Sequence, residues 1–233
     1  MFKVIQPKVR AKQDWIDCYA KARHGHIIWD GWAVDPYNPA HAYTSSHQFV
    51  DRARQFGFFK TGNKVLDIGC GNCRLGIALS ELNITYVGID PMIKCIEFCR
   101  QAYEDYANFS FNHIDLYSEC SNPEGKVKPI DFTIPLGDQT IDDLVIYSVF
   151  THLQEIEIAA RYMLEIKRVL KPGGKLFCSW YRSPPNEIDP YVGRTCYLES
   201  DIMTMLNGFY FDFTYGGHTS AYYDQWGIFA TKI

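Results

Sequence analysis

The sequence predicts an α/β fold in which a largely parallel sheet is covered by helices on both faces. After about residue 60, short apolar runs typical of buried strands alternate with stretches of helical periodicity. Such alternation connects parallel strands through crossover helices. Two strand-like runs near the C-terminus leave no room for a helix between them, so they predict an antiparallel hairpin at one sheet edge.

Five apolar runs predict the parallel strands. They are residues 64–69 (KVLDIG), 84–90 (ITYVGID), 109–115 (FSFNHID), 141–150 (IDDLVIYSVF) and 175–181 (KLFCSWY). The polar stretch 117–140 contains Pro, Gly and Ser and predicts a long loop before the fourth strand. The hairpin comprises 209–215 and 225–233, joined by a loop over 216–224.

Helical spacing predicts helices over residues 74–82, 92–107 and 153–170. The second has a length of about four turns. The third carries one apolar stripe, made of Leu153, Ile156, Ala160, Met163, Ile166 and Leu170. The sequence KPGG that follows should end this helix, because proline and glycine commonly stand just beyond a helix terminus.

Composition limits the function classes. Hydrophobic residues make up 47% of the 233 residues and charged residues 21%, which indicates a buried globular core. The net charge of −4 argues against binding nucleic acid through a basic surface. No apolar run reaches the roughly 20 residues that span a bilayer, and the N-terminus lacks the apolar region of a signal peptide, so we expect a cytoplasmic chain without membrane contact.

Residues 1–60 differ from the rest of the chain. They contain three of the five tryptophans and four of the seven histidines. Because we find no repeat and no linker-like composition, we expect one domain over 1–233, with an N-terminal lid over 1–60 and a ligand-binding core over 61–233. No pattern in the sequence predicts an oligomeric state.

The first predicted strand ends in a glycine-rich turn, Gly69-Cys70-Gly71. In an open parallel sheet, ligands bind beyond the carboxyl ends of the strands, and glycines allow close approach of the backbone there. A dinucleotide fingerprint would require glycine where Arg74 stands. The carboxylate of Asp67 would also repel a diphosphate, whereas it suits a cofactor with an ammonium and a sulfonium group.

Asp90 ends the second predicted strand. An acid about 20 residues beyond the glycine turn is placed to bind the ribose hydroxyls of a nucleoside cofactor. The alternative is that Asp90 only caps the following helix, with Pro91 at its first position. Beside the glycine turn, the ribose interpretation is favoured.

The ordered motifs VLDIGCGNC, YVGIDPM, FNHID, TIDDLVIYSVFTHL and VLKPGGKLFCSW resemble those of class I S-adenosylmethionine-dependent methyltransferases, over residues 62–182. The resemblance implies a Rossmann-like sheet of seven strands with an antiparallel last strand, and S-adenosylmethionine as cofactor with S-adenosylhomocysteine as product. The cofactor-binding residues that we expect from it are Asp67, Gly69, Cys70, Gly71, Asn72, Asp90, Pro91, Met92, Asp115, Leu116, Ser148 and Phe150. Of these, Asp115 and Leu116 would frame the adenine, and Ser148 and Phe150 would line the methyl-transfer face.

Cys70 and Cys73 form a C-x-x-C pair inside the same turn. A structural zinc site needs four ligands, and the second close pair, Cys95 and Cys99, is expected to lie away from the turn, two turns into the next helix. We therefore expect thiols that fill space and no metal site, although the adjacent carboxylates Asp142 and Asp143 keep a metal open.

Methyl transfer to a hydroxyl requires a proton acceptor, for which His152 after the fourth strand is our first candidate and His218 the second. Each could instead have only a structural role. We expect the substrate-binding residues to be Trp32, Tyr181, Arg182, His218 and Tyr222, since aromatic planes with polar groups suit a sugar ring. A loose resemblance to glycan-associated methyltransferases favours O-methylation of a sugar or small hydroxylated metabolite. The alternatives are N- or C-methylation of a small molecule, or a binding protein of the same fold without turnover.

Overall fold

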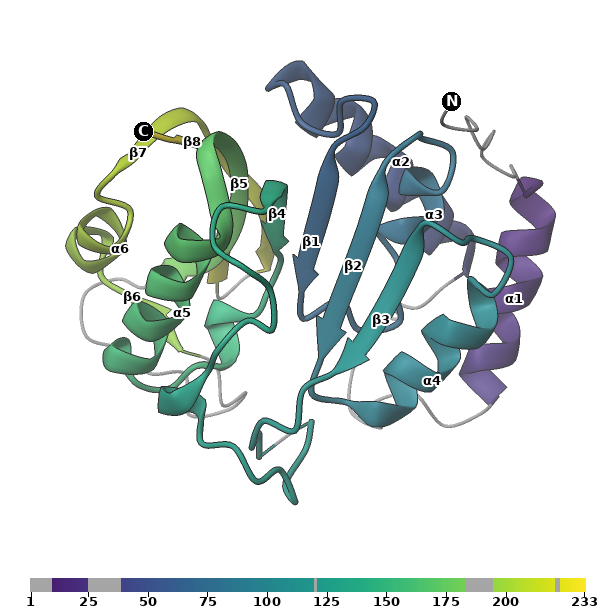
Figure 1. Ribbon diagram of the computed structural model, residues 1–233, viewed down its shortest axis with the longest axis horizontal. Helices are drawn as coiled ribbons and strands as arrows, with labels where there is room; N and C mark the ends of the chain where they lie inside the picture. The colour runs from purple at the N-terminus through teal and green to yellow at the C-terminus, as the bar shows by residue number, and fades with distance from the viewer. Residues whose placement is uncertain (1–9, 25–38, 120, 183–194, 221–222) are drawn as a thin grey trace.

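The computed structural model describes residues 10–24, 39–119, 121–182, 195–220 and 223–233. Its helices are α1 (Lys12–His24), α2 (Pro39–Gln55), α3 (Gly76–Leu79), α4 (Ile93–Ala102), α5 (Ile156–Val169) and α6 (Glu199–Met205), with 3-10 turns η1 (Pro129–Asp131) and η2 (Phe150–His152). Its strands are β1 (Lys64–Ile68), β2 (Thr85–Asp90), β3 (Phe109–His113), β4 (Ile141–Ile146), β5 (Leu170–Arg182), β6 (Cys196–Tyr197), β7 (Phe209–Ser220) and β8 (Tyr223–Lys232) (Figure 1).

The strands form one sheet in the order β3-β2-β1-β4-β5-β8-β7, and the two-residue β6 pairs with the end of β5. The strands from β3 to β5 pair in parallel, whereas β8 runs antiparallel to both β5 and β7. The main path of the described sheet therefore has seven strands with an antiparallel last strand. This confirms the predicted Rossmann-like α/β fold and the predicted C-terminal hairpin.

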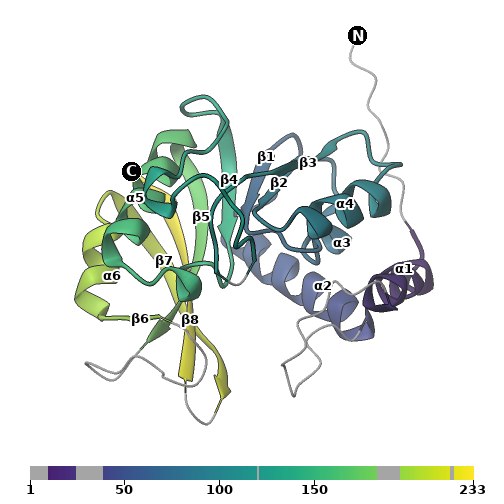
Figure 2. The same ribbon diagram turned by 90° about the horizontal axis from the view of Figure 1, so that it is seen from below.

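Alternate residues of the central strands face two separate apolar layers. Leu66, Leu144 and Leu176 point into the layer that also contains the buried faces of α5 and α6. Their neighbours Val65 and Val145 point into the opposite layer, which contains residues from α1 to α4. Figure 2 shows the two groups of helices on either side of the sheet. Since both faces are covered, the strands are apolar on both sides, as a parallel sheet requires.

The described parts of the N-terminal segment belong to the core. Trp15 of α1 and Ala53 of α2 are fully buried, and Phe58, which follows α2, is almost fully buried. The Trp15 ring packs on Tyr103 with ring centroids 4.9 Å apart. Helices α1 and α2 thus cover one face of the sheet, and the predicted role of residues 1–60 as a lid stays a prediction.

Several expected element boundaries differ from the structure. Helix α4 ends at Ala102 and not at residue 107, because Tyr103 leaves helical geometry (φ −113°, ψ 21°) and stacks on Phe109 at 5.2 Å. The hairpin strands are longer than predicted, so that His218 lies in β7 and not in a loop. Helix α5 ends before KPGG as predicted.

The described helices include none that is both long and apolar enough to cross a membrane.

Candidate active site

The carboxyl ends of three central strands meet at one edge of the sheet. The strand register pairs Ile68 of β1 with Ile89 of β2 and with Ile146 of β4. Gly69, directly beyond β1, and Asp90, the last residue of β2, therefore lie side by side. Strands β2 and β3 lie on one side of β1, and β4 and β5 on the other. This is the switch point of the sheet, where ligands bind in folds of this kind.

Both glycines of the turn have a positive φ, which favours glycine. Gly69 has φ +72°, and a Cβ there would lie 2.3 Å from Cγ2 of Val149, so a larger residue would clash. Gly71 has φ +52°, and among the described residues no atom beyond its two chain neighbours lies within 4 Å of the position that its Cβ would take. Gly71 thus faces open space at the strand ends, which fits a backbone surface against which a ligand can lie.

Asp90 holds the turn in place through both carboxylate oxygens. Its Oδ2 accepts a hydrogen bond from the Gly71 N–H and its Oδ1 from the Met92 N–H, both at 2.8 Å. The capping alternative is wrong in its placement, because α4 begins at Ile93 with Met92 as its N-cap residue, so that Pro91 precedes the helix and Asp90 bonds the N-cap residue instead of capping the helix itself. Burial raises the pKa of Asp90, while these two backbone donors and the charge of His113 counteract the rise. His113 Nε2 lies 2.9 Å from the carbonyl oxygen of Pro91.

Asp67 is buried beneath the turn, with 4% of its surface exposed. The hydroxyl of Tyr86 donates a hydrogen bond to its Oδ2 (2.7 Å), and no described residue donates one to its other oxygen. Burial raises the pKa of Asp67 to about 7, although the Tyr86 hydroxyl and Arg74 favour the charged form. A cation near the free oxygen would lower this pKa, so the site favours a positively charged ligand.

The residues after β3 begin a long loop, and side chains of α5 hold this loop in place. The Val127 N–H donates to the Asp115 carbonyl (2.9 Å), and Leu116 is buried. Farther along the loop, Phe132 stacks on Tyr162 of α5 with ring centroids 3.8 Å apart. The guanidinium of Arg168 donates to backbone carbonyls of the same loop. Asp115 and Leu116 therefore have a defined place beside the β2 end.

The residues after β4 are in a strained turn. Ser148 has φ +60°, which is uncommon for a residue with a side chain. Its N–H donates to Oγ of Ser179 (2.7 Å), which holds this conformation. Phe150 is fully buried and stacks on Trp180 at 3.7 Å, whereas His152 is exposed at the end of η2. Strained residues of this kind cluster at functional sites.

Of the expected substrate-binding residues, Tyr181 is half-buried at the end of β5, where the register pairs it with Gln225 and Cys196. Arg182 and His218 lie in β5 and β7, but their side chains are outside the described residues. Trp32 and Tyr222 are also outside them. The role of these residues stays a prediction.

The expectation that Cys95 and Cys99 lie away from the turn is wrong for Cys99. Its thiol donates to the carbonyl of Gly71 (Sγ to O 3.3 Å), to which the thiol of Cys70 also points (3.7 Å). Only the fold could show this contact, because it joins α4 to a turn 28 residues earlier. Cys70, Cys73 and Cys99 are buried free thiols. Burial raises the pKa of Cys99, and thiols of this kind are unreactive.

Asp142 and Asp143 have separate partners. Asp142 bonds Lys171 Nζ (2.6 Å), whereas Asp143 accepts from Asn63 Nδ2 (2.8 Å) and from the Phe59 N–H (2.9 Å). Within the part of the chain that the structure describes, no three His, Cys, Asp or Glu side chains are grouped as metal ligands.

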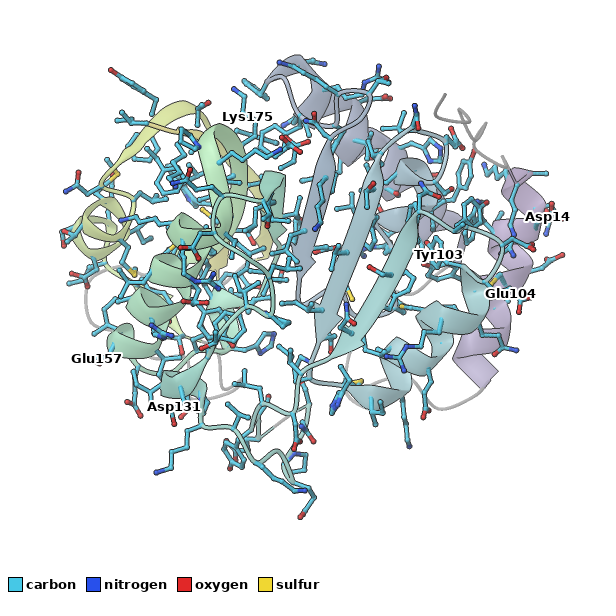
Figure 3. All side chains as sticks on the ribbon, viewed as in Figure 1. Asp14, Tyr103, Glu104, Asp131, Glu157 and Lys175 are labelled. Atoms are coloured by element: carbon cyan, nitrogen blue, oxygen red, sulfur yellow. The ribbon has the colours of Figure 1, made fainter. Side chains whose placement is uncertain are left out.

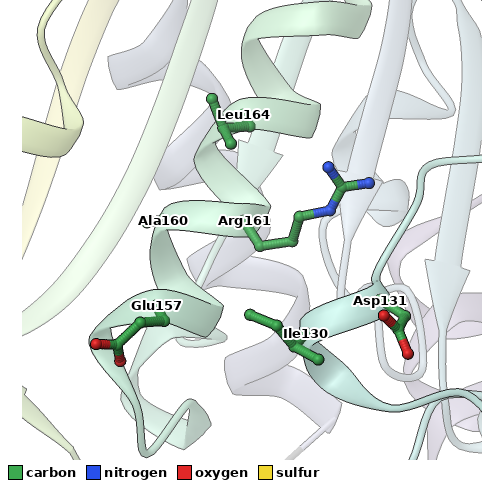
Figure 4. A pocket seen from close by; sticks show the side chains of 6 residues that line it. All are labelled: Ile130, Asp131, Glu157, Ala160, Arg161 and Leu164. Atoms are coloured by element: carbon green, nitrogen blue, oxygen red, sulfur yellow. The ribbon is translucent and has the colours of Figure 1, made fainter.

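An open hollow on the outer side of α5 is separate from the strand-end site (Figure 4). It is lined by Ile130, Asp131, Glu157, Ala160, Arg161 and Leu164. None of these residues belongs to the glycine turn or to the strand ends, so the hollow adds nothing to the candidate active site.

A family model described as a methyltransferase domain matches residues 66–178. The match begins within β1 and ends within β5, so it includes the glycine turn, Asp90 and the ends of β3 and β4. These residues form a class I methyltransferase domain. The cofactor of this class is S-adenosylmethionine.

The curated relatives of this methyltransferase domain match about half of the chain. The ubiquinone biosynthesis O-methyltransferase of rat mitochondria is 31% identical over 117 residues, which is 50% of this chain and 30% of the rat protein. An uncharacterised methyltransferase of Schizosaccharomyces pombe is 26% identical over 123 residues, 52% of this chain and 41% of that protein. The chain thus spans less than half the length of these relatives.

Solved structures share the fold over most of the chain. The N-methyltransferase NodS of Bradyrhizobium japonicum, solved with S-adenosylhomocysteine, has a TM-score of 0.64 at 16% identity, covering 93% of this chain and 99% of NodS. The [4+2]-cyclase SpnF has a TM-score of 0.66 at 15% identity, covering 94% and 93%. At these identities the likeness concerns the fold alone.

Proposed function

We propose that this chain binds S-adenosylmethionine at the ends of β1 and β2 and transfers its methyl group to a hydroxyl of a small molecule. The observation that carries the proposal is the open Cβ position of Gly71 in a turn that Asp90 bonds, together with the second buried carboxylate, Asp67, in the preceding strand. One carboxylate suits the positive charges of the cofactor, and the other suits its ribose diol.

The residues present fit this cofactor. The free oxygen of Asp67 can accept from an ammonium group or lie near a sulfonium, because only its Oδ2 is bonded to a described residue. Each oxygen of Asp90 accepts one backbone hydrogen bond and retains a lone pair for a ribose hydroxyl. Gly69, Cys70, Asn72, Pro91 and Met92 supply the surrounding backbone.

The remaining proposed contacts come from the ends of β3 and β4. Asp115 and Leu116 would frame the adenine, with Leu116 supplying a buried apolar surface. Ser148 and the backbone of Phe150 would line the side on which the acceptor lies, since the Phe150 side chain is fully buried against Trp180. The strain at Ser148 supports a functional role, since a left-handed conformation persists only where contacts hold it, here the hydrogen bond that the Ser148 N–H donates to Oγ of Ser179.

When bound, the cofactor supplies an electrophilic methyl group on sulfur. The chain must hold the acceptor oxygen in line with that group and remove the hydroxyl proton as the oxygen–carbon bond forms and the carbon–sulfur bond breaks. His152 is proposed as the proton acceptor, because it is exposed just beyond the β4 end. S-adenosylhomocysteine and a methyl ether are the products.

We propose a sugar or another small hydroxylated metabolite as the acceptor. The naming of several curated relatives as O-methyltransferases supports O-methylation. N- or C-methylation is the second candidate, and the N-methyltransferase NodS has the same fold. A protein of this fold that does not transfer methyl groups also stays a candidate, since one fold neighbour is named a cyclase.

An acceptor screen tests the proposal. Sugars, phenols and amines are incubated with the protein and S-adenosylmethionine, and formation of S-adenosylhomocysteine is measured. Turnover with hydroxyl acceptors alone is expected. Turnover with amines alone would replace O-methylation by N-methylation, and tight cofactor binding without turnover on any acceptor would favour the non-transferring alternative.

The variant His152→Ala tests the proposed proton acceptor. Loss of general-base help should lower kcat by about 10²–10⁴-fold while cofactor affinity stays the same. A variant that keeps a tenth or more of the wild-type kcat would show that the base lies elsewhere, and His218→Ala would then be measured in the same way.

A further inference from the structure

The carbonyl groups of the glycine turn are bonded by side chains from distant elements. The Gly71 carbonyl accepts from the thiol of Cys99 at 3.3 Å. The hydroxyl of Tyr19, in α1, lies 2.7 Å from the carbonyl oxygen of Asn72 and 2.8 Å from that of Cys73. The hydroxyl of Tyr103 lies 2.8 Å from the same oxygen of Cys73. Three consecutive carbonyls therefore have side-chain donors behind the turn.

The two tyrosine hydroxyls can donate to different carbonyls of the turn. Each hydroxyl has one proton, so Tyr103 can donate to Cys73 while Tyr19 donates to Asn72. The two hydroxyl oxygens lie 3.2 Å apart, in a position to form one network. Burial raises the pKa of both tyrosines well above the usual 10, so both remain protonated donors.

Aromatic packing determines where these hydroxyls lie. Tyr19 and Tyr103 are 4% and 2% exposed, and the fully buried ring of Trp15 packs against both of them. Tyr103 lies where α1, α4 and β3 come together (Figure 3). Tyr19 also packs edge-on against Phe98 of α4 at 5.3 Å. The orientation of α1 on the core therefore places the Tyr19 hydroxyl.

The turn requires such support because its backbone is strained. Cys73 has φ +56°, a left-handed conformation that disfavours a residue with a side chain. A conformation of this kind persists only where the surrounding structure holds it. Bonds to its carbonyls thus hold the turn in the conformation that leaves the Cβ position of Gly71 open, where the ligand is proposed to lie.

We propose that Tyr19 is a positioning residue of the cofactor site, through which the N-terminal helix α1 sets cofactor affinity by holding the Gly71–Cys73 turn. The inference rests on the proposed binding of S-adenosylmethionine at this turn. Helix α1 precedes residues 66–178, which match the methyltransferase domain, so this proposal extends the cofactor site to a helix outside that domain.

The test compares Tyr19→Phe with Ser80→Ala in the full chain. Ser80 is 1% exposed and donates to the carbonyl of Ile77 (2.7 Å), so this control also removes one buried hydroxyl donor from a backbone carbonyl, but outside the turn. Calorimetry with S-adenosylhomocysteine measures affinity, and hydrogen exchange of the backbone amides of residues 70–75 without ligand measures the order of the turn.

Tyr19→Phe is expected to raise the Kd about tenfold and to accelerate exchange in residues 70–75, since the Asn72 carbonyl loses its buried donor. At saturating cofactor, kcat should match that of the wild type. Ser80→Ala should leave the Kd and the exchange of this segment within twofold of the wild type. If Tyr19→Phe does not fold, Trp15→Phe, which changes the α1 ring that packs on Tyr19, replaces it with the same expected direction of change.

Exchange in residues 70–75 that is equal in the α1 variant and in Ser80→Ala would overturn the inference, whether or not the protein binds the cofactor. Equal Kd values in the two variants would overturn it as well. A wild-type protein that binds neither S-adenosylmethionine nor its product would overturn the proposed function, and the exchange result would still decide whether Tyr19 holds the turn.

Discussion

Adding one methyl group to the glycine turn should weaken cofactor binding without disturbing the protein around it. Gly71→Ala places a Cβ where, apart from its chain neighbours, no atom of the described structure lies within 4 Å, so that the methyl group is expected to meet the proposed ligand. The positive φ of +52° costs the folded state about 1–2 kcal/mol. Crowding of the bound cofactor should add about 1–3 kcal/mol to binding, a Kd increase of roughly 5- to 150-fold.

Gly62→Ala is the matched control. Gly62 has φ +87°, and the described residues beyond its chain neighbours likewise leave 4 Å free around an added Cβ, but it lies in the turn before β1, at the opposite end of the strand from the glycine turn. Both variants should lower the Tm by roughly 2–8 °C, and only Gly71→Ala should raise the Kd for S-adenosylhomocysteine in calorimetry. Wild-type affinity in Gly71→Ala, or an equal loss in both variants, would refute the placement of the ligand on this face.

Three further predictions concern the acids and thiols around the turn. Burial raises the pKa of Asp67 to about 7, so ionising this carboxyl group in the folded state is unfavourable. Its contribution to the free energy of unfolding should be fully present below the ordinary pKa near 4 and should be lost as the pH rises to 7, a decrease of about 4 kcal/mol. Affinity for S-adenosylmethionine should rise from pH 6 to pH 8, as Asp67 ionises. Asp67→Asn should remove both the fall in stability, measured by denaturation, and the rise in affinity, measured by calorimetry. A wild-type affinity that does not depend on pH would contradict the contact of Asp67 with the cofactor. Asp90→Ala should lose about 1.5–3 kcal/mol of binding free energy, measured by calorimetry, and it also removes the acceptor of the Gly71 and Met92 N–H groups. Unchanged affinity would exclude the ribose contact. Replacing Cys70 and Cys73 together by Ser should retain cofactor binding, and elemental analysis of the wild type should find no stoichiometric zinc; one metal per chain that the double variant loses would show a metal site.

The order of elements could be predicted from the sequence because it depends on local periodicity. Strands such as 64–69 and 84–90 are short apolar runs, and the stripe on α5 repeats at helical spacing. The absence of a crossover helix between β7 and β8 predicted their antiparallel pairing. The glycine turn and the strand-end acids Asp67 and Asp90 were recognisable for the same reason, since each lies next to the element that positions it.

The tertiary structure alone decided which distant groups meet at that turn. Tyr19 reaches the turn across 53 residues of sequence, and Cys99 across 28. In the sequence Tyr19 is one aromatic residue among many in an N-terminal segment expected to be a lid, and Tyr103 is one position in a helix expected to continue through it. Their hydroxyls acquire a role only when Trp15 and α4 pack together, because a hydrogen bond depends on the position and direction of both partners, and local periodicity determines neither.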